Sequence, residues 1–573
     1  MKKWLIREPV GKEDAEKLGN LPDLVRYLLF YRGIKTQDEA EKFLNPDYEA
    51  HLHDPFDMLG MNKAVDRILQ AIKNDERIII YGDYDADGVC SSVIICEFLK
   101  KIGFENYHIH IPDRHKDGYG LTLEVIDEFI EQNTKLLVTF DCGITDVEEV
   151  AKANSNGIDV IITDHHLVQG KVPNAFAIVD AKQKDDRYPF DMLCGAGVSF
   201  KLVQALVDKA GKDLKIAPGW EKWLLDLVAI ATIADMVPLV DENRTLTYFG
   251  LKVLKRYRRQ GISAFLKKLK INPAHINEGD IGFMIAPRVN IASRMEHANT
   301  SFELLSTESE EEANWIVGRL EELNNSRKKI VENILKEVFL KFDKEKPEIV
   351  FIGNQNWHPG VLGIAANRLI DKYNCPVFLW GKGESVDFKG SCRALAESGL
   401  NLVDLMNEIP DGILIGAGGH ALAGGFTIRE GQIENLEKGL IEAYRKAPKN
   451  ETGEVVLNID KRLSIDDINW SIYSMVEKLE PFGVENPAPV FLFSNIEIDN
   501  IKKFGNGGIH LQLDFKKSDN KIVPAIGFFI ANEEKFNLQK GDKIDLVASI
   551  EKSTFRNIPE LRLRIVDLRR VNL

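Results

Sequence analysis

Three carboxylates stand at alternate positions directly after an apolar run, in the segment from Arg77 to Ser92. The run at 78–81, Ile-Ile-Ile-Tyr, predicts a buried strand, and Asp83, Asp85 and Asp87 follow it within one short turn. Carboxylates this close together repel each other and raise each other's pKa values, so a divalent cation or several strong donors must compensate their charge. A solvated acidic turn is the alternative, because short motifs often occur by chance.

Two further polar clusters also follow apolar runs. Asp141 comes directly after the run at 136–140, and Asp164-His165-His166 comes directly after the run at 160–163. The alternation of strand-like and helix-like segments from Arg77 onward predicts a mainly parallel sheet with helices on both faces. The carboxyl ends of the strands in such a sheet face one crevice. We therefore expect all three clusters to meet at one edge, which favours a metal site over a solvated turn.

The donor types indicate which metal this site would take. Carboxylates and imidazoles without a thiolate suit manganese or magnesium better than structural zinc. We expect two ions, because one carboxylate can bridge metals about 4 Å apart that together stabilise a phosphoryl group during attack by water. Asp235 adds a further acid at the end of the apolar helix predicted at 224–234. A carboxylate there faces the negative end of the helix dipole, and a metal would remove that cost.

Composition limits the class of protein. A chain of 573 residues with 44% hydrophobic content predicts three or four globular domains. We expect a cytoplasmic protein without membrane attachment, because the longest apolar runs fall short of the roughly 18 residues of a span and the Met-Lys-Lys-Trp start lacks a signal peptide's apolar core. Six scattered cysteines argue against zinc ribbons and iron–sulfur clusters. The net charge of -14 disfavours bulk coating of nucleic acid but allows a nuclease with an acidic site.

The middle of the chain predicts a long helix and a second α/β unit. The helix should run from Thr307 to Phe342 behind a Thr307/Glu310 capping box, and its basic run at 327–329 either lines a nucleic-acid groove or is a solvated face. In the α/β unit at 348–446, glycine-rich turns allow close approach of phosphate or simply tight packing. Polar residues beside these turns favour phosphate binding: His358, Ser391, Arg393 and His420.

The last part of the chain, from about Thr452, is rich in strands. Five short runs with glycine turns predict a small Greek-key barrel. Arg562 and Arg564 alternate with apolar residues, which predicts one buried and one basic face. A mixture of cations and aromatics suits stacking and phosphate contact with a single strand, although a barrel with solvated arginines is the alternative. These residues are Lys502, Lys503, Phe504, Phe555 and Arg556.

The motifs resemble a known superfamily in order and approximate spacing. Asp83-Tyr-Asp-Ala-Asp-Gly, Asp141-Cys-Gly, Asp164-His165-His166 and Ala234-Asp235 are similar to the four motifs of the DHH phosphoesterases. Over nearly its whole length the chain most resembles the bacterial RecJ single-strand exonucleases. This resemblance implies an α/β protein with a mainly parallel-sheet DHH domain, a second α/β (DHHA1) domain joined by a long helix, and an OB-like β-barrel. The expected ranges are 1–75 for an N-terminal helical segment, 76–300 for the DHH domain, 301–345 for the connecting helix, 346–448 for the DHHA1 domain and 449–573 for the OB-fold.

The resemblance also implies roles for individual residues. The expected metal ligands are Asp85, Asp87, Asp141, His165 and Asp235, with Asp141 as the bridge. His166 would lie near the scissile phosphate, and Asp83 would be a further catalytic acid. The expected contacts to DNA or to a 5′-phosphate are Arg114, Arg288, His358, Ser391, Arg393 and His420. Ile291, Ser293 and Asp180 depart from the family pattern. These differences bear on the geometry of local loops and leave the expected metal ligands unchanged.

The function implied is a metal-dependent 5′ to 3′ exonuclease on single-stranded DNA in repair and recombination, with two Mn²⁺ or Mg²⁺ ions and 5′-mononucleotide products. Polarity and product come from the resemblance, as do a single-strand-binding protein and a RecQ-type helicase as partners; we expect a monomer. One alternative is a DHH phosphodiesterase on short RNAs or small nucleotides, but those usually lack the barrel. The other is a replication or repair scaffold without catalysis, against which the intact acids argue.

Overall fold

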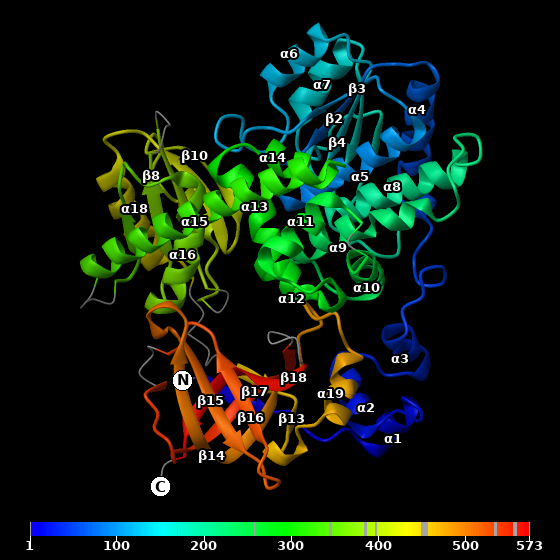
Figure 1. Cartoon of the computed structure of the whole chain (residues 1–573). Helices are drawn as coiled ribbons and strands as arrows, with labels where there is room; N and C mark the ends of the chain where they lie inside the picture. The colour runs from blue at the N-terminus through cyan, green and yellow to red at the C-terminus, as the bar shows by residue number, and fades with distance from the viewer. Residues whose placement is uncertain are drawn as a thin grey trace.

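The acidic segment after Arg77 lies at the carboxyl edge of a five-stranded parallel sheet (Figure 1). The strand order is β3-β2-β4-β5-β6, and every neighbouring pair is parallel. The strands are β2 (Ile78–Gly82), β3 (Tyr107–His110), β4 (Leu136–Phe140), β5 (Asp159–Thr163) and β6 (Ala177–Val179). The predicted parallel sheet is confirmed, and β6 is an additional strand. The computed structural model describes residues 2–168, 170–256, 258–342, 347–382, 387–395, 398–448, 456–531, 536–553 and 559–571, without the side chains of Asp371 and Asn506.

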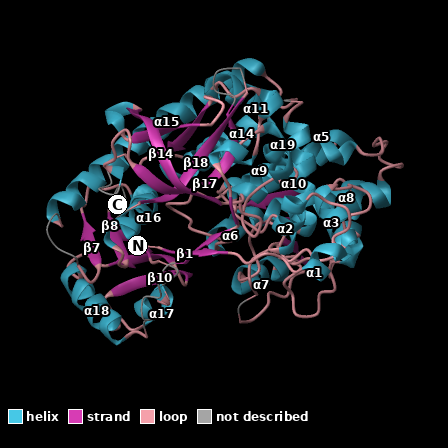
Figure 2. Cartoon of the chain, turned by 90° about the horizontal axis from the view of Figure 1, so that it is seen from below, coloured by secondary structure: helices cyan, strands magenta, loops and turns pink. Residues whose placement is uncertain are grey.

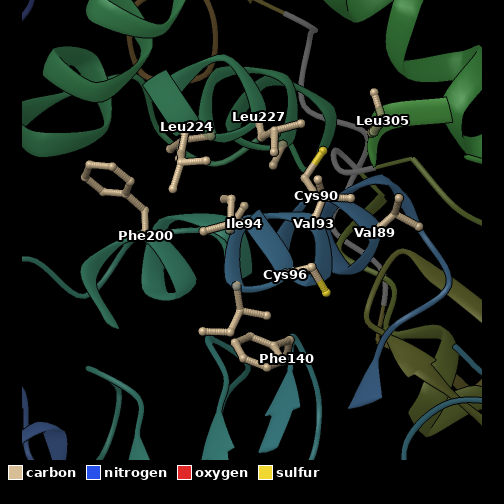
Figure 3. Packing of buried hydrophobic residues seen from close by; sticks show 14 of the residues in the cluster. Val89, Cys90, Val93, Ile94, Cys96, Phe140, Phe200, Leu224, Leu227 and Leu305 are labelled. Atoms are coloured by element: carbon tan, nitrogen blue, oxygen red, sulfur yellow. The ribbon is translucent and has the colours of Figure 1, made fainter. Parts of the chain in front are cut away.

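Helices cover both faces of this sheet. One face packs on α4 (Met61–Lys73), α5 (Ala86–Ile102) and α8 (Gly195–Ala210), and the other on α6 (Leu123–Glu131) and α7 (Val147–Ser155). Helix α5 is buried on every side, with β4, α8, α9 (Leu225–Ala234) and α14 (Asn299–Ser306) around it (Figure 3). Beyond it lie α10 (Asp241–Leu254), α11 (Gln260–Leu269) and α13 (Ala286–Met295). This surrounding layer holds the first turn of α5, which carries the acids, in a fixed place.

A long helix leads into a second α/β sheet. Helix α15 (Glu310–Lys341) begins behind Ser309, whose side chain accepts a hydrogen bond from the Glu312 amide at 3.2 Å. The predicted Thr307/Glu310 capping box was therefore wrong by two residues, because two hydroxyls compete for this position and Ser309 takes it. The sheet order is β10-β11-β9-β8-β7, with only the β7–β8 pair parallel. The strands are β7 (Val350–Gly353), β8 (Val377–Gly381), β9 (Phe388–Arg393), β10 (Leu414–His420) and β11 (Ala423–Ile428).

This second sheet also has helices on both faces. Helices α15 and α16 (Pro359–Tyr373) pack on one face, and α17 (Leu402–Asn407) and α18 (Ile433–Lys446) pack on the other. Figure 2 shows α16 and α18 on two sides of the strands β7, β8 and β10. The end of β9, with Ser391 and Arg393, faces α16, because a Cβ on Gly363 of that helix would lie 2.7 Å from Arg393 Nη2.

The C-terminal strands close into a barrel. The pairings run β14–β15–β16–β18–β17 and return from β17 to β14, and β13 (Lys461–Arg462) pairs in parallel with the first residues of β14. The five strands match the five predicted ones: β14 (Phe491–Phe504), β15 (His510–Lys516), β16 (Ile522–Gly527), β17 (Lys543–Ser553) and β18 (Glu560–Arg570). The predicted alternation is present on β18, where Leu563 and Ile565 are buried and the half-buried Arg562 and Arg564 share Glu551, at 3.0 and 2.8 Å. Phe555 and Arg556 lie outside the described residues.

The N-terminal segment is not purely helical, contrary to the prediction for residues 1–75. Strand β1 (Lys3–Ile6) pairs in parallel with β12 (Val456–Ile459), a partner more than 400 residues away that no local pattern reveals. Helix α2 (Asp23–Phe30) shares a hydrophobic core with the barrel and α19 (Trp470–Glu477). Helices α1 (Lys12–Lys17) and α3 (Gln37–Leu44) complete the segment before α4. Within the described ranges, no helix combines the length and apolarity that crossing a bilayer requires.

Candidate active site

Three acids and a histidine from separate elements meet at the carboxyl edge of the first sheet. His165 Nε2, after β5, lies 3.0 Å from Asp141 Oδ1, after β4. The same nitrogen lies 3.7 Å from Asp87 Oδ2 in the first turn of α5 and 3.8 Å from Asp235 Oδ2 at the end of α9. Sequence reasoning placed these residues at one edge, and the structure brings them within contact distance.

The ligand atoms fall into three overlapping groups, one of which is Asp141, His165 and His166. The other two groups adjoin each other. Asp87, His165 and Asp235 offer one nitrogen and two oxygens, and the second group offers three carboxylates, Asp83, Asp85 and Asp141; within each group the ligand atoms lie within 4.8 Å of one another. Asp141 stands in the second group and directly beside His165 of the first. Two cations could therefore sit next to each other with Asp141 between them, and the oxygen-rich donor set suits Mn²⁺ or Mg²⁺.

The protonation of these acids provides a test of whether they fit a cation. Among the residues that the structure describes, Asp83 Oδ1 and Asp141 Oδ1 are buried and accept no hydrogen bond, although His165 Nε2 lies close to Asp141 Oδ1. Burial and the neighbouring Asp85 raise the pKa of Asp83 to about 8, and the same two causes raise that of Asp235 to about 7. Burial and then Asp87 raise the pKa of Asp141 well above its usual range. Acids that are this costly to ionise, with oxygens that accept no hydrogen bond in the described structure, are the groups whose charge a divalent cation compensates.

Backbone hydrogen bonds aim two of the carboxylates. Asp85 caps α5, with Oδ1 accepting from the amides of Asp87 (2.7 Å) and Gly88 (3.2 Å). Asp87 in turn accepts from the amides of Gly195 (2.6 Å) and Ala196 (2.7 Å) at the start of α8. Position 195 must be glycine, since a Cβ there would lie 2.7 Å from Asp141 Cβ. The turn after β2 is therefore fixed to α8 and closely packed against Asp141.

His166 is held by a neighbouring acid and a tyrosine. Its Nδ1 lies 2.7 Å from Asp164 Oδ1 and 3.0 Å from the Tyr119 hydroxyl, which donates to the Asp141 carbonyl at 3.2 Å. Burial opposes the charge on His166, but the hydrogen bond to Asp164 and the charge of that acid outweigh it and raise the pKa of His166 to about 9. His166 therefore carries a proton beside the acidic groups at neutral pH. Tyr119 was not singled out from the sequence, because a tyrosine in a loop gives no local signal.

Three arginines from different segments gather beside the acids, and we call Arg114, Arg294 and Arg393 the arginine cluster. Arg114, after β3, lies 4.9 Å from the ring centre of Tyr84, and Arg294 ends α13. Burial and then Arg114 lower the pKa of Arg294 to about 10, whereas Asp85 opposes this shift. Burial, with a contribution from Arg114, also lowers the pKa of Arg393. In the part of the chain that the structure describes, none of the three forms an ion pair, so the cluster is suited to an anionic ligand.

The remaining predicted contacts lie at varied distances from this cluster. Ser391 Oγ accepts a hydrogen bond from Arg393 Nη1 at 3.1 Å. His358 caps α16, and its Nδ1 accepts from the Gly360 amide at 3.2 Å. His420 is exposed on β10, in the same row of the sheet as Arg393 with Ala423 between them.

Arg288 does not join the cluster. It is buried, forms an ion pair with Glu321 of α15, and donates from Nη1 to the Met284 carbonyl at 2.7 Å. These contacts fasten α13 to α15. Its guanidinium is therefore engaged inside the protein, which argues against the predicted contact with DNA.

Comparison with known proteins decides the family. Family models match at 77–232 (DHH family, N-terminal domain), 326–446 (DHHA1 domain) and 459–567 (RecJ OB domain). The single-stranded-DNA-specific exonuclease RecJ of Bacillus subtilis strain 168 is 34% identical over 574 residues, covering 99% of this chain and 70% of that protein. The chain belongs to the RecJ family. The RecJ of Escherichia coli K12 is 32% identical over 85% of this chain and 86% of its own length.

Solved RecJ structures share the fold. The crystal structure of RecJ in complex with Mn²⁺ from Thermus thermophilus has a TM-score of 0.82 and 25% identity, covering 100% of this chain and 80% of that chain. A second, exonuclease RecJ bound to manganese, has a TM-score of 0.60 and 31% identity over 68% of this chain and 96% of that one. These matches confirm the predicted family and the α/β architecture with a C-terminal OB domain. The RecJ relatives also support the manganese or magnesium site predicted from the donor types.

Proposed function

We propose that this chain is a metal-dependent exonuclease that digests single-stranded DNA from its 5′ end and releases 5′-mononucleotides. The observation that carries the proposal is the juxtaposition of two opposite charge groups. The acidic groups, which could hold two cations, lie close to the arginine cluster. The charge of Asp85 reaches Arg294 and opposes the lowering of its pKa. A hydrolytic site beside a fixed anion site is what an enzyme needs to cut at a measured distance from a terminal phosphate.

We assign the ligand roles by donor group. Asp87, His165 and Asp235 would hold one divalent ion, and Asp83, Asp85 and Asp141 the other, with Asp141 placed to serve both. The ions supply charge neutralisation at the phosphoryl group and activation of water. The protein's own contribution is positional: α5 and α8 aim the carboxylates, and Asp164 keeps a proton on His166, which can donate to a non-bridging phosphate oxygen.

The arginine cluster and Ser391 would bind the 5′-phosphate. A terminal phosphate carries one more ionisable oxygen than an internal one, and planar guanidinium groups match that geometry with paired hydrogen bonds. Arg114 and Arg294 come from the first sheet's side of the molecule and Arg393 from the second, so a terminal phosphate would join the two halves. Of these residues Arg294 was missing from the sequence prediction, which had placed Arg288 here.

The barrel would bind the rest of the strand. Lys502 and Lys503 are exposed at the end of β14, and Phe504 beside them lies 5.1 Å from the His510 ring and 6.3 Å from the Phe528 ring, measured between centres. Aromatic faces with neighbouring cations hold single strands by stacking and phosphate contact. In this proposal, residues 449–573 form the OB domain that binds the strand. Residues 76–300 form the catalytic part, and residues 346–448 supply Arg393.

For the cellular setting we propose what the family resemblance implies. A monomer acting in the cytoplasm, together with a single-strand-binding protein and a RecQ-type helicase, fits an exonuclease that needs unwound DNA. Pull-down of the purified chain with each candidate partner, and sedimentation of the chain alone, test these points.

Digestion of a long single strand tests the proposed function. A strand labelled at its 5′ end should release labelled mononucleotide at once with Mn²⁺ and not with a chelator, whereas a 3′-labelled strand should shorten gradually. An equal rate on duplex DNA, or early release from the 3′-labelled strand, would contradict the proposed substrate or polarity. Exclusive activity on RNAs of a few nucleotides would support the phosphodiesterase alternative.

A further inference from the structure

His115 is connected to all three segments that carry the arginine cluster. It follows Arg114 directly in the chain. Its Nε2 donates to the backbone carbonyl of Arg294 at 3.1 Å. Its own carbonyl accepts from Lys389 Nζ at 2.6 Å, and Lys389 stands on β9 four residues before Arg393. One residue thus links the loop after β3, the end of α13 and the second sheet.

The surroundings hold the imidazole in one orientation. The Asp113 side chain accepts from the His115 amide at 2.8 Å, and the ring of His115 meets that of His358 edge-on at 5.2 Å between centres. A Cβ on Gly360 would lie 2.2 Å from the Arg294 carbonyl and 3.1 Å from His115 Cε1. The first turn of α16 therefore packs directly against the hydrogen bond between His115 and Arg294.

This link solves an electrostatic problem of the cluster. Guanidinium groups close together repel each other, and a carboxylate that held them in place would also cancel the charge needed for a phosphate. His115 acts through backbone carbonyls instead. Because the Arg294 carbonyl is an acceptor, the N–H of the imidazole must be on Nε2, and burial lowers the pKa of His115, so the ring is neutral at neutral pH. The arginines are held without being neutralised.

We propose that His115 is a positioning residue for the 5′ end of the substrate: it sets the spacing of Arg114, Arg294 and Arg393 so that they meet one terminal phosphate. The proposal rests on the 5′-phosphate site of the proposed function. It adds a residue that touches neither metal nor scissile bond and that acts only through the arginines.

Two substitutions at position 115 separate positioning from packing. His115→Phe keeps a flat ring against His358 and loses the donor, whereas His115→Gln keeps a side-chain N–H. For a 5′-phosphorylated strand, His115→Phe should raise KM roughly 3- to 15-fold with kcat little changed, the effect of one lost hydrogen bond on a binding step. His115→Gln should recover most of this loss. On a 5′-hydroxyl strand both variants should resemble the wild type.

Further variants identify which part fails. Lys389→Met removes the hydrogen bond from the second sheet to the His115 carbonyl and should likewise raise KM for the 5′-phosphorylated strand. This variant provides the test if His115→Phe does not fold. In an Arg393→Ala background His115→Phe should add little. Equal KM increases on both strands, a fall in kcat alone, or no recovery in a folded His115→Gln would overturn the role of His115. If Arg393→Ala loses the same factor in kcat/KM on both strands, the phosphate site itself is wrong and the proposal fails with it; if Arg393→Ala loses activity mainly on the 5′-phosphorylated strand and only the His115 variants lack the effect, the site stands.

Discussion

Replacing Arg393 by alanine gives the most direct test of end recognition. The two hydrogen bonds of its guanidinium within the described residues both use Nη1, to Ser391 Oγ at 3.1 Å and to the Cys392 carbonyl at 2.7 Å. These bonds fix the group and leave Nε and Nη2 for a ligand. A paired contact from that edge to a phosphate is worth about 1.5 to 4 kcal/mol, which corresponds to roughly one to three orders of magnitude in rate. Since Arg114 and Arg294 remain, we expect the lower half of that range, about 10- to 100-fold.

The assay compares one sequence with two 5′ ends. The kcat/KM of Arg393→Ala on a 5′-phosphorylated strand should fall by this factor, and on a 5′-hydroxyl strand by much less, because the hydroxyl never made the contact. Arg393→Lys should lie between, since it keeps charge without the planar pair of donors. Arg445→Ala is a matched control, because Arg445 is an exposed arginine of the same domain paired with Glu348. Equal losses on both strands, with an unchanged melting temperature, would refute the reasoning.

Three other predictions address the metals and the barrel. Asp141→Ala should abolish hydrolysis and weaken Mn²⁺ binding without lowering the metal-free melting temperature, because repulsion among the acids is relieved; wild-type turnover would contradict the two-ion site. The free energy of unfolding of the metal-free protein should fall as the pH rises from about 4 to about 8. The raised pKa values of Asp83 (about 8) and Asp235 (about 7) keep protons in the folded state that the unfolded chain releases over this range. Mn²⁺ should therefore raise the melting temperature more at pH 8 than at pH 5.5, which melting curves with and without metal measure. Joint replacement of Lys502 and Lys503 by Glu should weaken binding to long strands and reduce its salt dependence, while strands too short to reach the barrel are cut normally; an unchanged salt slope would exclude these lysines from the DNA path.

The sequence predicted those features that depend on local patterns. Apolar runs of four or five residues located strands of the first sheet, and short runs between glycine turns located those of the barrel. The position of Asp83, Asp141 and His165 at a common edge then followed from a general property of parallel sheets. No long-range information was needed, because each acid directly follows its strand or lies within one turn of it.

Contacts between distant segments were not predictable in this way. Strand β1 has its partner at β12, and Arg288 has its partner in α15, so neither the N-terminal strand nor the burial of Arg288 has a local signature. Arg288 and Arg294 stand six residues apart on one helix region, and composition does not distinguish them. The structure does: the first forms an ion pair with an acid inside the protein, whereas burial and the surrounding arginines lower the pKa of the second.

The charges that the protein leaves uncompensated carry the functional argument. A chain with 88 acidic and 74 basic residues has a carboxylate available for every cation, yet the three half-buried arginines of the cluster have none in the described structure. Pairing them would have stabilised the free protein, since a buried unpaired charge is costly. The buried acids show the same feature with the opposite sign, because Asp83 Oδ1 and Asp141 Oδ1 accept no hydrogen bond within the described structure. Two neighbouring sites, one short of positive charge and the other short of negative charge, would both be completed under the proposed function by one set of ligands, divalent cations and a phosphate end.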